Sequence, residues 1–213
     1  MRYRAASDRS LLVSFGPEIP EEISDANRGL VDSLTRKLVA ARPPGILNVH
    51  PAYASLLVVF DPLTLDHRGV ERLCESTEEI PAPEQRTVEI PVHYGDEYGP
   101  DLADVARHTR LTREEVVRIH AGADYVVHFL GFSPGFPYLG GLPDSIATPR
   151  LSSPRTRVPA GSVAIGGGQT GVYPSASPGG WRIIGWTPLR LFDAAADPPA
   201  LLSMGSRIRF QAL

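Results

Sequence analysis

The chain has few of the features that would narrow its function at once. It has one cysteine, Cys74, which excludes an internal disulfide and fits a reducing cytoplasm. No apolar run approaches the roughly 20 residues of a membrane-spanning helix, and the start, MRYRAASDRS, has no apolar segment typical of a secretory signal. The net charge is −3 and the pI is near 6.1, whereas nucleic-acid-binding proteins usually have a strongly basic face. We therefore expect a cytoplasmic protein with no membrane or nucleic-acid partner.

The sequence also lacks the spacings of common metal and nucleotide sites. Its six histidines show no paired metal-ligand spacing, and with a single cysteine we expect no metal site. It has no Walker A motif, so any nucleotide site would be unconventional or shared with a partner. His93, at a predicted strand end, and His128, in an apolar strand, are the candidates for acid–base catalysis. For His128 a structural role in the core is the alternative.

Apolar periodicity predicts an α+β protein with two domains, residues 1–84 and residues 85–213. The first is predicted to have strands at 10–15, 46–50 and 55–60 and helices at 20–42 and 67–79. This pattern indicates helices on one face of an antiparallel sheet. Cys74 is predicted to pack inside it. The proline-rich segment 80–84 is predicted to be a linker.

The second domain is predicted to be a β-barrel or sandwich with a helical pair. The helices are expected at about 101–108 and 113–120, and Thr112 with Glu115 forms a T-x-x-E capping box at the second start. Short segments divided by glycine and proline are typical of strands in such folds. The predicted strands are 87–92, 125–130, 162–165, 171–173, 182–185 and 207–210.

Glycine and proline are abundant between His128 and Pro188, a stretch called here the Gly/Pro block. It holds 12 of the 20 glycines and 9 of the 21 prolines. Aromatic residues are interleaved with them, so the block has a core to join. Its four arginines, against the single acid Asp144, give it a local charge of +3. These features favour a rigid, loop-built pocket for an anion.

Two motifs in the block match known sites but lack their context. Residues 131–135 read G-x-S-x-G, yet the residue after Ser133 is a proline, which has no N–H for an oxyanion hole. Residues 166–171 read G-x-G-x-x-G, but a predicted strand follows in place of the required helix. We therefore expect neither a serine-hydrolase elbow nor a dinucleotide site. The consecutive glycines could form an anion-binding concavity or a tight turn.

Arg155 and Arg157 are the leading candidates for anion binding. Residues two apart in a strand share a face, so both guanidiniums could converge on one phosphate or carboxylate; a solvated strand is the alternative. Further candidates could contact the ligand through polar groups or aromatic rings. They are Ser133, Phe136, Tyr138, Gln169, Thr170, Tyr173, Gly179, Gly180 and Trp181. We expect Phe132, Phe136, Tyr138 and Leu139 to turn inward and line the pocket.

Several long motifs of the Gly/Pro block resemble a known protein family. FLGFSPGFPYLGGLP, PRTRVPAGSVAI, GGQTGVYP and SPGGWRIIGWTP resemble the family of the 5-oxoprolinase B subunit, also called allophanate hydrolase subunit 1 or the KipI family. The resemblance extends to SDRSLLVSFG, SLLVVFDPL, IPVHYGDEYGPDLADVA and GSRIRF, and so covers nearly the whole chain. It departs at Ser7, where the family often has glycine before the acidic residue. The resemblance implies a ferredoxin-like N-terminal domain and a cyclophilin-like C-terminal β-barrel.

The resemblance also implies partners and a reaction. The expected partners are the 5-oxoprolinase C subunit, which is KipA-like and also called allophanate hydrolase subunit 2, and the LamB-type A subunit. With them the chain is expected to use ATP to open 5-oxoproline to L-glutamate, and to be inactive alone. Two alternatives stay open. One is a KipI-type inhibitor of a sensor histidine kinase, and the other is a carboxyltransferase component of a urea or allophanate system.

Overall fold

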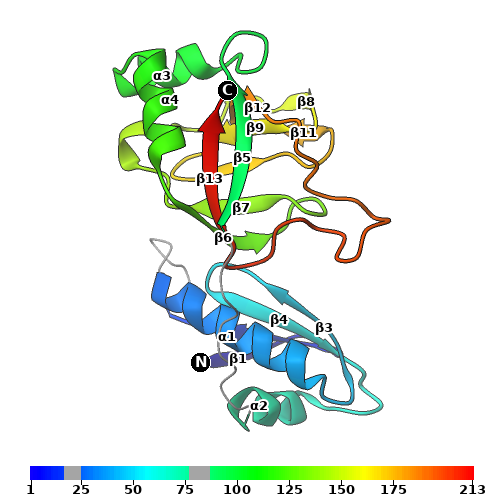
Figure 1. Cartoon of the computed structure of the whole chain (residues 1–213). Helices are drawn as coiled ribbons and strands as arrows, with labels where there is room; N and C mark the ends of the chain where they lie inside the picture. The colour runs from blue at the N-terminus through cyan, green and yellow to red at the C-terminus, as the bar shows by residue number, and fades with distance from the viewer. Residues whose placement is uncertain (17–24, 77–86) are drawn as a thin grey trace. The chain divides into compact units, whose positions relative to one another are not determined.

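The structure, a computed structural model, describes residues 1–16, 25–76 and 87–213 (Figure 1). The chain divides into two compact units, Met1–Glu84 and Gln85–Leu213. The linker predicted at 80–84 lies outside the described residues, as do the start of the helix predicted from 20 and the end of the helix predicted to 79. We describe each unit by itself.

The described residues of the first unit form a four-stranded antiparallel sheet with two helices (Figure 1). The strand order is β1-β2-β4-β3, which makes β1 and β3 the edge strands. The strands are β1 (Arg2–Ser7), β2 (Ser10–Ser14), β3 (Ile46–Pro51) and β4 (Ser55–Phe60), and the helices are α1 (Asp25–Ala41) and α2 (His67–Ser76).

Both helices of the first unit contribute to one apolar core with a single face of the sheet. Leu11 and Val13 of β2 lie opposite Val58 and Leu56 of β4, and all four are buried. The helical residues of this core are Val31, Leu34, Leu38, Val70 and Cys74. The predicted packing of helices on one face, and of the cysteine inside, is confirmed. Burial, with the nearby Glu75 and Glu71 carboxylates, raises the pKa of the Cys74 thiol to about 11.

The edge strand β1 was missed by the sequence prediction. Its residues RYRAAS are nearly all exposed, so the strand shows no apolar alternation to reveal it. With β1 the element order becomes ββαββα. A ferredoxin-like domain has the order βαββαβ, so this connectivity does not show one, and the ferredoxin-like assignment stays a prediction.

The second unit contains a closed β-barrel, in agreement with the prediction (Figure 1). Its strand order is β10-β7-β6-β13-β5-β12-β9, with β13 parallel to β5. The barrel strands are β5 (Thr87–Tyr94), β6 (Tyr125–Leu130), β7 (Pro137–Gly140), β9 (Ser162–Ile165), β10 (Thr170–Val172), β12 (Arg182–Trp186) and β13 (Arg207–Ala212). Two further strands, β8 (Arg155–Val158) and β11 (Ser177–Gly179), pair with each other in a separate two-stranded ribbon.

Three helical segments accompany the barrel: α3 (Leu102–Thr109), α4 (Arg113–Gly122) and the 3₁₀ turn η1 (Asp144–Ile146). The capping box predicted at the start of α4 is confirmed. The backbone N–H of Glu115 donates to Thr112 Oγ1 at 3.1 Å, and the backbone N–H of Thr112 donates to Glu115 Oε2 at 2.7 Å. The second bond lowers the pKa of the Glu115 carboxyl. Among the described residues, no helix is long and apolar enough to cross a membrane.

The barrel wall has apolar residues on both sides. Val163 and Ile165 of β9 belong to the main core of the unit, whereas Ala164 between them belongs to a second, smaller core. Successive residues of a strand point to opposite faces, so the second core lies against the outside of the barrel. Val158 of the β8–β11 ribbon joins that outer core. The ribbon therefore packs against the outer wall, which is where much of the Gly/Pro block lies.

Candidate functional site

The outer core contains an aromatic cluster of Phe136, Tyr173 and Trp181, with Tyr138 packed against it. The ring of Phe136 lies 5.1 Å from that of Tyr173 and 5.5 Å from that of Trp181, both edge to face. Tyr138 lies 5.8 Å from Trp181, also edge to face. Such pairs of rings stabilise a core beyond the area that they bury. Four predicted ligand-contacting residues are therefore brought together, and three of them are fully buried within the cluster.

Glycines leave the space that the rings occupy. A Cβ atom at Gly166 would overlap the indole of Trp181, and one at Gly179 would overlap the phenol of Tyr173. The predicted site residue Gly180 accepts at its carbonyl from the N–H of Leu151, at 2.7 Å. Burial raises the pKa of the Tyr173 phenol, so this group stays protonated at neutral pH. Close ring packing thus accounts for the glycines at 166 and 179.

The loop at 131–136 leads into the strand β7, not into a helix. Its backbone is folded on itself, because Ser133 N donates to Gly131 O at 2.8 Å and Phe136 N donates to Ser133 O at 3.1 Å. Ser133 Oγ is buried and has no hydrogen-bond partner among the described residues. Phe132 is 62 % exposed, yet its ring lies edge to face at 5.5 Å from that of Phe136 and at 6.3 Å from that of Tyr173. Its role in lining a pocket stays a prediction.

Arg155 and Arg157 lie in different environments, so the structure does not show the shared site predicted for them. Arg155 Nη2 donates to Asp101 Oδ1 at 2.7 Å, whereas Arg157 is exposed. The other carboxylate oxygen of Asp101 accepts from the backbone N–H of Ile183 at 2.7 Å. Asp101 is only 4 % exposed, so this carboxylate ties the ribbon strand β8 to the barrel strand β12. Arg155 Nη1 is buried and has no hydrogen-bond partner among the described residues.

Thr170 belongs to a buried polar network, not to the aromatic cluster. Its hydroxyl donates to Ala164 O at 3.0 Å, and its Oγ1 lies 2.9 Å from His120 Nε2. Because the one hydroxyl hydrogen is used, Nε2 must be the donor, and Nδ1 then accepts from the Tyr94 hydroxyl at 2.8 Å. Burial lowers the pKa of His120 to about 3, so the ring is neutral. No sequence pattern singled out His120, whose contact with Thr170 spans 50 residues.

The glycine run beside Gln169 is a turn held by backbone hydrogen bonds. Gly166 N donates to Gln169 O at 2.9 Å, and Gly167 N donates to Thr148 O at 2.8 Å. These two N–H groups are therefore used inside the protein and are not offered to an anion. Gly167 has a φ of 69°, a conformation that favours glycine. The geometry thus supports the tight turn.

The two candidate histidines lie on strands that are separated by β13 in the barrel order. The ring of His93, on β5, stacks on Tyr98 at 5.1 Å and lies 6.3 Å from that of Trp186. His128 is 6 % exposed at an irregularity of β6, and its ring occupies the space where a Cβ of Gly140 would lie. The role of either ring in acid–base chemistry stays a prediction.

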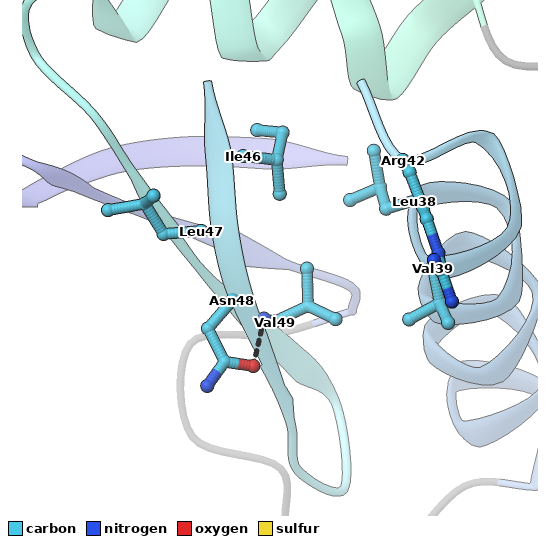
Figure 2. Close-up of a pocket in the computed structure, with 7 residues that line it drawn as sticks. All are labelled: Leu38, Val39, Arg42, Ile46, Leu47, Asn48 and Val49. Carbon is cyan, nitrogen blue, oxygen red and sulfur yellow. Dashed lines mark hydrogen bonds between the residues drawn. The ribbon is translucent and has the colours of Figure 1, made fainter. Parts of the chain in front are cut away.

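A cavity of about 300 Å³ lies in the first unit, between the end of α1 and the edge strand β3 (Figure 2). Ile46 and Val49 point toward α1, whereas Leu47 and Asn48 point away from it (Figure 2). The lining residues are Leu38, Val39, Arg42, Ile46, Leu47, Asn48 and Val49. None of the residues predicted from the sequence to bind a ligand lies here, and Arg42 is its one charged lining residue.

Comparisons with known proteins match most of the chain. Residues 1–202 match the family model of the carboxyltransferase domain, subdomains C and D. The 5-oxoprolinase B subunit of Bacillus subtilis (strain 168) is 44 % identical over 95 % of this chain and 89 % of its own length. The 5-oxoprolinase B subunit of Escherichia coli O157:H7 is 47 % identical over 91 % of this chain and 89 % of its own length.

A solved structure matches most of this chain within a longer chain. The crystal structure of TTHA0988 matches with a TM-score of 0.88 and 38 % identity, covering 97 % of this chain. This chain spans 40 % of that longer chain. The motif resemblance to the 5-oxoprolinase B subunit is therefore confirmed along nearly the whole sequence, and the chain belongs to the family of the carboxyltransferase domain, subdomains C and D.

Proposed function

We propose that this chain is the B subunit of an ATP-dependent 5-oxoprolinase, which opens the lactam of 5-oxoproline to L-glutamate together with the A and C subunits. The observation that carries the proposal is the near-full-length similarity to two proteins named as 5-oxoprolinase B subunits. The similarity spans both units of the structure, so it extends well beyond a single motif.

The lactam bond explains why such a reaction would use ATP. An amide carbonyl is a poor electrophile, and phosphorylation of its oxygen would create a leaving group. Catalysis of phosphoryl transfer depends mainly on positioning and on stabilising negative charge. The outer wall of the barrel suits that role, because the packed aromatic cluster holds the surrounding backbone rigid and Arg157, next to the buried Val158 in β8, is exposed. We assign to this chain the positioning of anionic groups.

We propose that the nucleotide site includes residues of another subunit of the complex. Ligand pockets typically have volumes of about 300–1,000 Å³. A cavity on the described part of the barrel unit, lined by residues of α3 and β12, has a volume of about 210 Å³, which is below that range. The N–H groups of Gly166 and Gly167 are used in the glycine turn and do not form a phosphate cradle. We therefore propose that the chain has little or no activity alone and acts when bound to the C subunit.

Co-expression tests this dependence. The chain and the C subunit, co-expressed and run on gel filtration at micromolar concentration, are expected to elute as one complex. A tag on either protein should then retain the other during affinity purification. Separate elution of two folded proteins contradicts the proposed assembly, and rapid 5-oxoproline hydrolysis by the chain alone contradicts its proposed dependence on a partner.

Carboxyl transfer is a second candidate function, favoured by the description of the matched family as a carboxyltransferase domain. A carboxyltransferase component of a urea or allophanate system would move a carboxyl group from a biotin carrier to an amide nitrogen. Consumption of carboxybiotin with urea as acceptor, without hydrolysis of 5-oxoproline, would support this function over the first.

The proposal includes a cellular location and a fold class for each unit. A cytoplasmic location fits the single cysteine, whose thiol is buried on α2. A cyclophilin-like class for the barrel and a ferredoxin-like class for the first unit follow from the family resemblance. Solving the structure of the complex would show whether both fold assignments hold.

A further inference from the structure

A cavity of about 210 Å³ lies on the barrel unit, outside the aromatic cluster. Its lining comes from α3, from the strand β12 and from the segment that follows η1. The lining residues are Asp104, Arg107, His108, Thr148, Pro149 and Arg182. None of these was selected from the sequence as a binding residue.

Asp104 lies between two guanidiniums of the cavity. Its Oδ1 accepts from Arg107 Nη2 at 2.5 Å, and its Oδ2 accepts from Arg182 Nη1 at 3.2 Å. An arginine carries five N–H donors. These contacts use one donor of Arg107 and one of Arg182, so both guanidiniums retain further donors. With His108 neutral, the lining has a formal charge of +1 from two arginines and one aspartate.

The wall beside Arg182 is held in place before any ligand arrives. Arg182 Nε donates to Pro149 O at 3.2 Å, which fixes the plane of the guanidinium. The neighbouring Thr148 exchanges two backbone hydrogen bonds with Gly167, of 3.2 and 2.8 Å. Its side-chain hydroxyl donates to Ile146 O at 3.1 Å, and the residue is buried. A preorganised donor set loses less entropy on binding than a flexible one.

We propose that this cavity binds a small oxyanion, a carboxylate or phosphate group, through Arg107 and Arg182. The planar fork of a guanidinium matches both groups and makes charge-assisted hydrogen bonds to them. A volume of about 210 Å³ equals that of roughly seven water molecules. That is enough for phosphate or a five-membered lactam acid and too little for a whole nucleotide.

The identity of the natural ligand rests on the proposed function. In a 5-oxoprolinase the oxyanion would be the carboxylate of 5-oxoproline or the phosphate released from ATP. The oxyanion chemistry itself does not rest on that function, because it follows from the lining residues. The opposite possibility is a cation held by the Asp104 carboxylate, and substitutions of opposite charge distinguish the two.

Calorimetric titration of the full chain tests the proposal with two probes, inorganic phosphate and L-5-oxoproline. At least one is expected to bind, and Arg182→Gln is expected to weaken it about tenfold or more through loss of a charge-assisted contact. Arg107→Gln is the second variant, since the side chain of Arg107 is 77 % exposed and its loss should leave the fold intact. Arg113→Gln removes an exposed arginine at the start of α4 and is the matched control, expected to leave binding unchanged.

A variant that makes the cavity more positive is expected to strengthen anion binding. Asp104→Asn removes a negative charge close to the ligand, so phosphate is expected to bind about fivefold more tightly. The proposal is overturned if neither probe binds, if binding survives both arginine substitutions, or if Asp104→Asn abolishes binding that the arginine variants keep. An active complex whose chain binds neither probe removes only this inference. Phosphate binding by a chain whose complex has no 5-oxoprolinase activity removes only the proposed function.

Discussion

The neutral His120 makes the barrel sensitive to acid. The folded barrel holds this ring without charge between Tyr94 and Thr170, and burial lowers its pKa to about 3 from an ordinary value of 6.5. Between these two values the unfolded chain binds a proton on the histidine that the folded barrel does not. The free energy of unfolding therefore falls as the pH falls through this range. Above about pH 7 neither state is protonated and the effect is absent.

The size of the effect follows from the two pKa values. A pH of 5 lies about 1.5 units below the pKa of the histidine in the unfolded chain. This difference corresponds to about 2 kcal/mol of lost stability. The loss would reach roughly 4 kcal/mol near pH 3. The ring is completely buried, so solvent does not screen this contribution. A domain is stable by about 5–15 kcal/mol in total, which makes the loss measurable.

Urea unfolding followed by tryptophan fluorescence is the suitable assay. Both tryptophans of the chain, Trp181 and Trp186, belong to the barrel unit, so the signal reports on that unit alone. His120→Gln is the comparison, because an amide offers a donor and an acceptor but no proton to titrate. Between pH 7.5 and pH 5 the native barrel is expected to lose about 2 kcal/mol more stability than the variant. Equal losses in the two proteins would refute the assignment of a buried neutral histidine.

Two further substitutions test the wall of the candidate site by the same assay. Arg155→Gln leaves one oxygen of the buried Asp101 carboxylate without its charged partner, and we expect the free energy of unfolding to fall by about 1–3 kcal/mol. A change below about 0.5 kcal/mol would show that this ion pair does not anchor the ribbon. Gly166→Ala forces a methyl group against the indole of Trp181, and we expect the free energy of unfolding to fall by about 1–3 kcal/mol. Gly168→Ala is the control, because its methyl group would meet no atom within 4 Å and should cost much less. Equal effects of the two substitutions would contradict the packing of Gly166 against Trp181.

Local patterns predicted much of the fold. The capping box at Thr112 and Glu115 depends on residues three apart. The apolar spacing of α1 predicted its buried face in part, because Leu34 and Leu38 are buried whereas Leu30 is 52 % exposed. The barrel was predicted because short apolar strands alternate with glycine and proline turns. The exposed edge strand β1 was missed because a strand without a buried face shows no alternation of apolar and polar residues.

The candidate site was harder to predict because its contacts join distant residues. Arg155 was selected for its spacing from Arg157, but its position is set by Asp101, which lies 54 residues away in the chain. The cavity at Arg182 likewise combines this strand residue with residues of α3. Only the folded barrel brings such residues together, and a local charge count shows that arginines are present without showing which carboxylates they contact.

Reconstitution with omission of single proteins tests the central claim most directly. The purified A and C subunits, this chain, ATP and 5-oxoproline are incubated together, and L-glutamate is measured by chromatography. The account predicts ATP-dependent glutamate formation by the full mixture and its loss when this chain or ATP is left out. Undiminished glutamate formation without this chain, or none in a mixture whose three proteins have assembled, would contradict its assignment as the B subunit of a 5-oxoprolinase.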